Sequence, residues 1–492
     1  MTRRQLGLGL ALLGLGSAWP AWAAPLGAPR RFGWDLLLRE AERRAKAPFR
    51  PRTAAAGADA IDYDRIGTLT FRPEATLAGG IRLFPVGRYA PEPVRISIVE
   101  NGRARAVAFD PALFSSSGEA RALGYAGFRA MTPDGRSDWL AFQGASYFRS
   151  SGSEDQYGLS ARAVAIDTGI SGKEEFPAFT DFWIERIGPQ AYAIHALLDG
   201  PSLTGAYRFV CRHEAGGVVQ DVSSVLFVRK GIERLGIAPA TSMFWYGEGN
   251  RAAGVDWRPE IHDSDGLAMW TGAGERIWRP LTNPPGERLD TFADRDPKGF
   301  GLMQRDRRFP NYQDDGAFYE KRPNLWVTPR GRWGAGAINL FAFNTTSETV
   351  DNVVAFWMPE AKPAAGQRLA FDYRLSWTST DLSAGPAARA VETFRGLAGR
   401  PGAEPVPGAE KIVVDFVGDT LAGLDRQSGV EPKVEVARGR MLAAAAYPVV
   451  GQKNRWRVTI DVAPSGRDPA EVRLYLARAG QALTETVLTQ AA

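Results

Sequence analysis

Alternating apolar and polar positions mark short strands along most of the chain. The clearest runs lie at residues 94–98, 164–166, 456–462 and 472–476, where every second residue is Val, Ile, Leu or Trp. Gly, Pro, Asn, Asp or Ser separates each run from the next. Period-two runs bounded by turn residues are typical of antiparallel sheets. The pattern therefore predicts an all-β protein built as a sandwich or a barrel.

Helical periodicity is clear in one N-terminal segment, residues 32–47. Phe32, Leu36, Leu37 and Ala41 fall on one side of a helix, and Arg and Glu occupy the rest. This spacing predicts an amphipathic helix whose apolar side packs on the sheets.

A Gly- and Pro-rich stretch at residues 396–408 divides the pattern into two parts. Such a stretch has little capacity for regular structure, so we predict a linker over residues 394–409. It would separate a large domain at residues 24–393 from a smaller one at residues 410–492. The size and alternating strands of the second part favour an immunoglobulin-like sandwich.

The first 23 residues have the parts of a secretory leader. Arg3 and Arg4 precede a short apolar run at residues 6–15, and the small residues Ala21 and Ala23 form a cleavage site. The run is too short to span a bilayer comfortably. The start resembles a twin-arginine signal, and an ordinary secretory leader with two arginines is the alternative. Either leader predicts export to the periplasm.

Composition excludes several function classes. Two of the positive charges belong to the leader, and their removal from the net charge of +5 leaves +3, too little to indicate a nucleic-acid partner. The single cysteine, Cys211, and three histidines provide few of the ligands that a zinc site needs. We expect neither a metal nor another cofactor. The 14 Trp and 13 Tyr side chains would suit stacking on sugar rings, although most Trp in any protein lie in the core.

Two acidic clusters are candidates for chemistry. In the first, at residues 258–267, Asp263 and Asp265 follow His262. A turn in which the aspartates bond backbone N–H groups is an alternative, and the spacing of an EF-hand calcium loop is absent. In the second, Asp351 and Asn352 precede an apolar strand. They are either ordinary polar residues at the start of a strand, or Asp351 is an acid whose apolar surroundings raise its pKa.

Together the clusters offer the two carboxylates that a glycosidase needs, one to protonate the leaving oxygen and one to activate water. Only the fold can bring them together. Aromatic and polar residues between and around them are typical of a carbohydrate cleft. The predicted glucan contacts are Asp265, Tyr246, Trp278, Arg279, Tyr312, Trp326 and Trp357. Motifs of serine hydrolases, nucleotide enzymes and zinc proteases are absent from the sequence.

A series of motifs resembles one known family. Residues 144–149 (GASYFR), 157–162 (YGLSAR), 258–267 (RPEIHDSDGL) and 278–281 (WRPL) occur in the same order as in the periplasmic glucan biosynthesis proteins, the MdoG/OpgG and OpgD family. The resemblance extends over about residues 32–380. It implies a galactose-mutarotase-like β-sandwich followed by an immunoglobulin-like domain. Departures from the family pattern occur at residues 84–94 and 341–345.

The resemblance also implies an activity. Family members act in making osmoregulated periplasmic glucans, and some are β-1,2-glucan hydrolases or transglycosylases that invert the anomeric centre. By position, Asp351 matches the family's general acid, and Asp263 matches its general base acting through water. The first alternative is a non-catalytic glucan-binding scaffold that assists a membrane glucosyltransferase. A sugar epimerase is a weaker one, resting on fold analogy. A homodimer is a further partner that the sequence allows.

Overall fold

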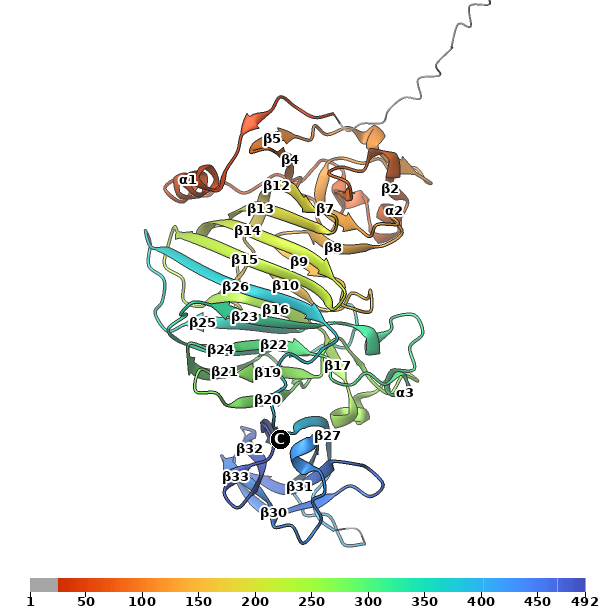
Figure 1. Cartoon of the computed structure of the whole chain (residues 1–492), viewed down its shortest axis with the longest axis vertical. Coiled ribbons are helices and arrows are strands. Elements are labelled where there is room, and N and C mark those ends of the chain that lie inside the picture. Colours follow the sequence, from red (N-terminus) through yellow and green to blue (C-terminus); the bar gives the residue numbers. More distant parts are fainter. Residues whose placement is uncertain (1–24, 401, 467, 492) are drawn as a thin grey trace, which may run out of the picture.

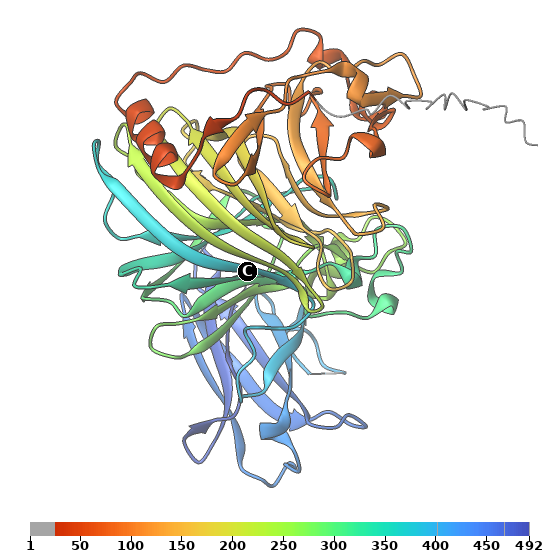
Figure 2. The same cartoon turned by 45° about the horizontal axis from the view of Figure 1, so that its top comes forward.

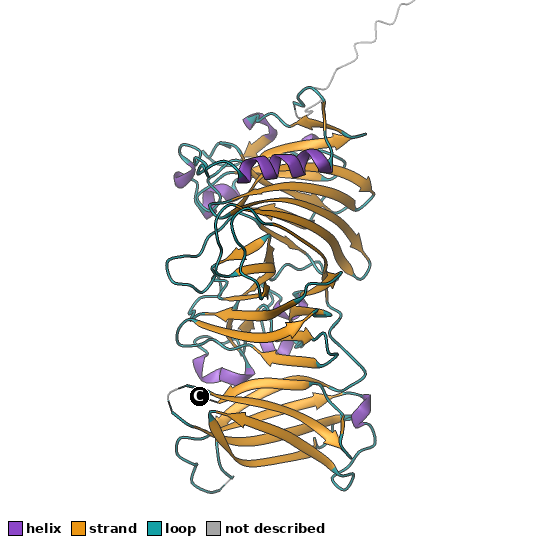
Figure 3. Cartoon of the chain, turned by 90° about the vertical axis from the view of Figure 1, so that its left-hand side faces the viewer, coloured by secondary structure: helices purple, strands orange, loops and turns teal. Residues whose placement is uncertain are grey.

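The protein consists of a large N-terminal domain and a smaller C-terminal domain stacked along the long axis (Figure 1). The computed structural model describes residues 25–400, 402–466 and 468–491, so the leader predicted at residues 1–23 lies outside the described residues. Strands are the predominant regular structure of both domains (Figure 3), and the predicted all-β class is confirmed. Within the described part of the chain, no helix is long and apolar enough to cross a membrane.

The N-terminal domain is a sandwich of two sheets. The first sheet contains, in spatial order, β1 (Arg30–Arg31), β5 (Arg103–Ala106), β4 (Arg95–Glu100), β12 (Ala178–Gly188), β13 (Ala191–Asp199), β14 (Leu203–Glu214), β15 (Gly217–Val228), β26 (Arg368–Thr378), β23 (Asn324–Arg330), β22 (Gly299–Met303), β19 (Gly266–Trp270) and β20 (Arg276–Pro280). Most neighbours are antiparallel, as the alternating pattern predicted; β4 and β12 are parallel.

The second sheet faces the first. It contains, in spatial order, β21 (Arg288–Arg295), β24 (Ala335–Ala342), β25 (Val353–Pro359), β16 (Leu235–Ser242), β10 (Ser160–Arg162), β9 (Tyr147–Ser150), β8 (Asp138–Gln143), β7 (Tyr125–Met131) and β3 (Ile81–Pro85), with β11 (Val164–Ile166) also on β16. Phe142 and Phe209, one from each sheet, meet edge to face with ring centroids 5.2 Å apart. Such aromatic pairs fill the core between the sheets.

Short helices and strands accompany the two sheets. The predicted N-terminal helix is α1 (Trp34–Ala45), which buries Leu37 and Ala41 against the first sheet. Figure 2 shows this helix across one end of the long strands. The other short elements are α2 (Tyr63–Gly67), α3 (Phe309–Tyr312), β2 (Leu69–Phe71), β6 (Phe114–Ser116), β17 (Phe244–Tyr246), β18 (Ile261–His262) and the 3₁₀ helices η1 (Ala58–Ala60), η2 (Pro73–Ala75), η3 (Pro111–Leu113), η4 (Glu248–Ala253), η5 (Tyr319–Lys321) and η6 (Asp419–Leu421).

The C-terminal domain is also a two-sheet sandwich. One sheet contains β27 (Arg389–Leu397), β28 (Glu410–Val417), β31 (Arg455–Pro464) and β30 (Gly439–Pro448). The other contains β29 (Val430–Ala437), β32 (Ala470–Arg478), β34 (Thr486–Ala491) and the short β33 (Gln481–Ala482). Val414, Phe416, Trp456 and Leu474 belong to its buried core.

The predicted position of the linker is wrong. Strand β27 pairs with β28 along Arg389–Leu397. The last residues assigned to the large domain (389–393) and the first residues assigned to the linker (394–397) therefore both belong to the C-terminal sheet. Residues 398–400 and 402–409 belong to the connection between these two strands of one hairpin, and the junction of the domains lies before residue 389. Composition identified a stretch without regular structure correctly, but strand pairing decides what such a stretch connects.

The two domains share hydrogen bonds and a core. Strand β20 of the N-terminal domain pairs in parallel with β34, through Ile277 with Thr486 and Trp278 with Val487. Trp278 and Trp326 lie in the same buried cluster as Phe416 of the C-terminal domain. The first sheet therefore continues from one domain into the other, which indicates a fixed interface.

Candidate functional site

The backbone brings the two candidate aspartates together. Asp351 precedes β25, and the next side chain, Asn352, accepts a hydrogen bond from Phe244 N (2.9 Å) and donates one to Phe244 O (3.0 Å). One residue earlier, Met243 O accepts a hydrogen bond from Asp263 N (2.8 Å). The segment at Met243 and Phe244 thus anchors both acidic loops, although 88 residues separate the aspartates in the sequence.

Asp351 holds its proton to a higher pH than an ordinary aspartate does. The residue is in contact with solvent, so a substrate could reach it. Burial nevertheless raises its pKa to about 6, and the negative charge of Asp263 adds to the increase. Three positive charges, Arg162, Arg149 and Arg322, oppose this increase.

Asp263 is the more enclosed partner, with 5% of its surface exposed. Burial raises its pKa, and an ion pair with Arg322 acts in the opposite direction. The Arg322 guanidinium also lies over the ring of Tyr319, 4.1 Å from its centroid, which fixes its position. The arginine therefore provides a fixed counter-charge for a carboxylate that few water molecules can reach.

Arginine and tyrosine side chains surround the aspartates on the outer face of the second sheet. Strand register places Arg162 opposite Tyr147, while their neighbours Ala161 and Phe148 point into the core. Arg162 lies over the Tyr147 ring at 5.1 Å and donates from Nε to Thr241 Oγ1 (3.1 Å). The charges of Arg162 and Asp351 both act on the pKa of Tyr147, so these groups share one site.

Sequence reasoning missed Arg149, Arg162, Arg322 and Tyr147 as site residues. A signal was present, because Tyr147 and Arg149, and likewise Ser160 and Arg162, stand two positions apart and so share a strand face. That spacing does not say whether the face is a site or an ordinary polar surface.

Beside the aspartates lies a buried histidine with acidic neighbours. Burial lowers the pKa of His262, but a hydrogen bond with Glu260 and the charges of Asp265 and Glu260 outweigh burial and raise it to about 9. Nε2 of His262 lies 3.0 Å from Glu260 Oε2, and Nδ1 lies 3.1 Å from Gln304 Oε1. Gln304 donates from Nε2 to two carbonyl groups, so its Oε1 accepts from a doubly protonated imidazole.

Asp265 serves the backbone. Its carboxylate accepts hydrogen bonds from the N–H groups of Arg305 and Asp306, which follow β22. Burial raises its pKa to about 6, with His262 opposing the increase and Asp306 adding to it. These bonds match the alternative reading of this segment, a carboxylate that stabilises a turn. No group of three His, Cys, Asp or Glu side chains among the described residues could hold a metal ion.

The remaining predicted glucan contacts lie in the interior. Tyr246, Tyr312 and Trp357 are fully buried, and the hydroxyl of Tyr312 donates to Asp306 O (3.1 Å). Trp278, Trp326 and Arg279 are also buried. Each of these six side chains is at most 5% exposed, which leaves too little surface for a face-on contact with a sugar ring in this structure.

The burial of Arg279, Trp278 and Trp326 has a structural reason. Arg279 pairs with Asp290 at 2.7 Å inside the N-terminal domain. Trp278 and Trp326 fill the core at the domain interface, where Arg305 lies 3.7 Å from the Trp278 ring centroid. An aromatic residue on a strand looks the same in the sequence whether it faces a cleft or a neighbouring domain.

Comparison with known proteins places the chain in a family. The family model described as "Periplasmic glucan biosynthesis protein, MdoG" matches residues 32–491. "Glucans biosynthesis protein D" of Xanthomonas oryzae pv. oryzae is 43% identical, with 100% of this chain and 98% of that protein covered. "Glucans biosynthesis protein D 1" of Ralstonia nicotianae is 45% identical, with 93% and 91% covered.

Among solved structures, a galactose mutarotase related enzyme from Lactobacillus acidophilus matches with a TM-score of 0.22 and 9% identity, covering 49% of this chain and 97% of that one. A TM-score this low carries no argument about activity. The family model and the named relatives, in contrast, cover nearly the whole chain. The chain therefore belongs to the MdoG family of periplasmic glucan biosynthesis proteins.

Proposed function

We propose that the protein is a periplasmic enzyme that cleaves β-1,2-glucan, or transfers parts of it, with inversion at the anomeric carbon. The observation that carries the proposal is the pairing of Asp351, whose pKa is raised to about 6, with the enclosed Asp263. Environments that push two nearby carboxyl groups into different roles are typical of glycosidases. The leader and the family name support the periplasmic location.

Asp351 acts as the general acid. Its exposure lets a glycosidic oxygen approach, and a pKa of about 6 leaves about one molecule in ten protonated at pH 7. The proton of Asp351 passes to the leaving oxygen as the bond between that oxygen and the anomeric carbon breaks. Reprotonation of the carboxylate from solvent then restores the acid.

Asp263 acts as the general base through water. With 5% exposure it is too enclosed to attack a sugar ring directly, whereas a water molecule is small enough to reach it. Asp263 accepts the proton of the water whose oxygen bonds to the anomeric carbon from the opposite face, which inverts the centre. A sugar hydroxyl in place of water gives transfer instead of hydrolysis.

Incubation of the mature protein with linear β-1,2-glucan, followed by analysis of product lengths, tests the proposal. We expect shorter or cyclised chains from the wild type and none from Asp351→Asn or Asp263→Asn. Asp59→Asn is a matched control, because Asp59 is an exposed aspartate on a different element. Activity that survives in Asp351→Asn would overturn the proposal.

A glucan-binding scaffold that assists a membrane glucosyltransferase is the second candidate. The names of the relatives favour it, because they describe biosynthesis and not cleavage. A scaffold predicts measurable glucan binding and unchanged glucan in the same assay. Sedimentation of the purified protein would show in addition whether a homodimer forms.

A further inference from the structure

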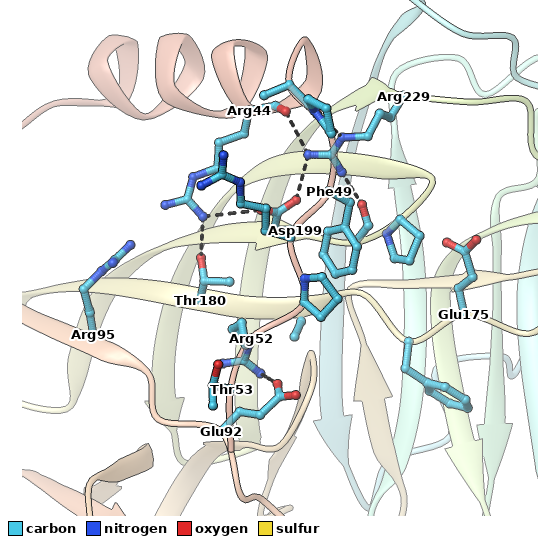
Figure 4. Close-up of a pocket in the computed structure, with 18 of the residues that line it drawn as sticks. Arg44, Phe49, Arg52, Thr53, Glu92, Arg95, Glu175, Thr180, Asp199 and Arg229 are labelled. Atoms are coloured by element: carbon cyan, nitrogen blue, oxygen red, sulfur yellow. Dashed lines mark hydrogen bonds and ion pairs between the residues drawn. The ribbon is translucent and has the colours of Figure 1, made fainter. Parts of the chain in front are cut away.

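A large cleft lies at one end of the first sheet, away from the candidate aspartates. It has a volume of about 1110 Å³, and its walls come from the end of α1, the extended residues 47–53 and the ends of β12 and β13 (Figure 4). Arg43, Arg44, Arg50, Arg52, Arg95 and Arg229 are its cationic lining residues. None of the predicted site residues lines it.

The acidic lining residues Glu92, Glu174, Glu175 and Asp199 offset part of this positive charge. Asp199 accepts from Arg229 at 3.0 Å and from Arg44 at 3.5 Å, and Glu92 pairs with Arg52 (Figure 4). Glu175 pairs with Lys230 at 3.0 Å. An anion would have to compete with these carboxylates, whereas a neutral ligand with many hydroxyl groups could use the donors and acceptors that the ion pairs hold in place.

The cleft continues toward the candidate aspartates. A second cavity of about 240 Å³ shares Arg52, Glu92, Phe176 and Ala178 with it. The second cavity is also lined by Tyr147, the ring beneath Arg162 next to Asp351. Arg162 further pairs with Glu174 of the large cleft at 3.3 Å. The two cavities and the outer face of the second sheet therefore adjoin one another.

Two exposed aromatic rings lie along this path. Tyr89 lines the second cavity with 75% exposure, and Phe176 lines both cavities with 53% exposure. Arg162 lies 5.5 Å from the centroid of the Phe176 ring. A flat ring that stays in water beside a cavity offers an apolar surface for the C–H face of a sugar.

We propose that these two cavities form a distal binding site for a neutral glucan chain, continuous with the candidate catalytic residues. The inference rests on the proposed function in taking glucan as the substrate. The rings of Tyr89 and Phe176 stack on sugar units, and the paired arginines and carboxylates hydrogen-bond their hydroxyl groups. Such a site distinguishes long chains, which reach both regions, from short ones, which reach the aspartates alone.

Calorimetric binding of linear β-1,2-glucans of increasing length to the Asp351→Asn protein tests this inference without cleavage. Phe176→Ala and Tyr89→Ala, each added to this background, should weaken the binding of long chains about tenfold, since a lost ring contact is of the order of one decade in affinity. Short chains should bind with unchanged affinity. Tyr63→Ala is the matched control, because Tyr63 is 77% exposed and lines neither cavity.

The outcomes separate this inference from the proposed function. If both variants bind long chains as the background protein does, the distal site is wrong, whether or not the wild type cleaves glucan. If the variants lose affinity for long chains while the wild type cleaves no glucan, the distal binding site is supported and the proposed catalytic activity is refuted. Preference for an acidic polysaccharide, lost at high salt, would overturn the neutral ligand class. Unchanged thermal melting confirms that each variant is folded.

Discussion

The ion pair between Arg322 and Asp263 makes a strong prediction about stability. In Arg322→Met the aliphatic part of the side chain is kept and the positive charge is lost. Asp263, with 5% exposure, then has no direct counter-charge. A buried carboxylate that has lost its counter-charge is expected to lower the free energy of unfolding by about 3–5 kcal/mol.

Protonation of Asp263 sets an upper limit to that loss. An aspartate with an unfolded pKa of about 3.9 can be protonated at a free-energy cost of about 1.4 kcal/mol per pH unit above that value, so about 4 kcal/mol at pH 7 and about 1.5 kcal/mol at pH 5. The folded pKa of Asp263 is raised in the variant, so its penalty grows as pH increases. The stability gap between wild type and variant should therefore widen between pH 5 and pH 7, by at most about 2–3 kcal/mol, because the pKa of Asp263 is already raised in the wild type.

Urea denaturation at several pH values measures this gap. Loss of the contact between Arg322 and Tyr319 also lowers stability, but that contribution does not depend on pH in this range. The double variant Arg322→Met with Asp263→Asn, compared with Asp263→Asn alone, is the control, and its gap should change less with pH because residue 263 no longer titrates. A gap in the single variant that stays the same from pH 5 to pH 7 would refute the reasoning.

Three further predictions concern the site and its support. Cleavage by the wild type should decline above pH 6 by up to tenfold per pH unit, because Asp351 with a pKa of about 6 must be protonated; a rate that is constant from pH 6 to pH 8 would contradict this role. His262 has a pKa raised to about 9, so the stability that it contributes is fully present below its unfolded pKa of about 6.5 and is lost as pH rises through 9. Thermal melting should fall over this range in the wild type and fall less in His262→Gln. Trp278→Ala should lower the free energy of unfolding by about 3–5 kcal/mol through a cavity at the domain interface, with glucan affinity unchanged in calorimetry.

The fold was largely predictable because its signals are local. Alternation at residues 456–462 and 472–476 corresponds to β31 and β32, and the apolar side of residues 32–47 corresponds to α1. The linker was misplaced because the signal used to predict it is also local. Gly and Pro report where regular structure stops, but not which strands lie on either side of the stop.

The candidate site was predictable in its acids and not in its surroundings. Asp263 belonged to an acidic cluster beside His262 and Asp351 preceded an apolar strand, and the structure connects both to the segment at Met243 and Phe244. The buried Trp278, Trp326 and Trp357 did not stand out as core residues. Indole rings suit a sugar cleft and a protein core equally well, so residue type did not separate the two.

By itself, the amino-acid sequence determined the all-β class and the N-terminal helix, because each follows from residue type and near-neighbour spacing. It offered the two candidate acids only through acidic clusters and the resemblance to a family. The tertiary structure alone decided which side chains meet. Strand register and hydrogen bonds between distant segments placed Arg162 and Arg322 beside the aspartates and turned the tryptophans inward. Those interactions join residues far apart in the chain, and no local pattern encodes them.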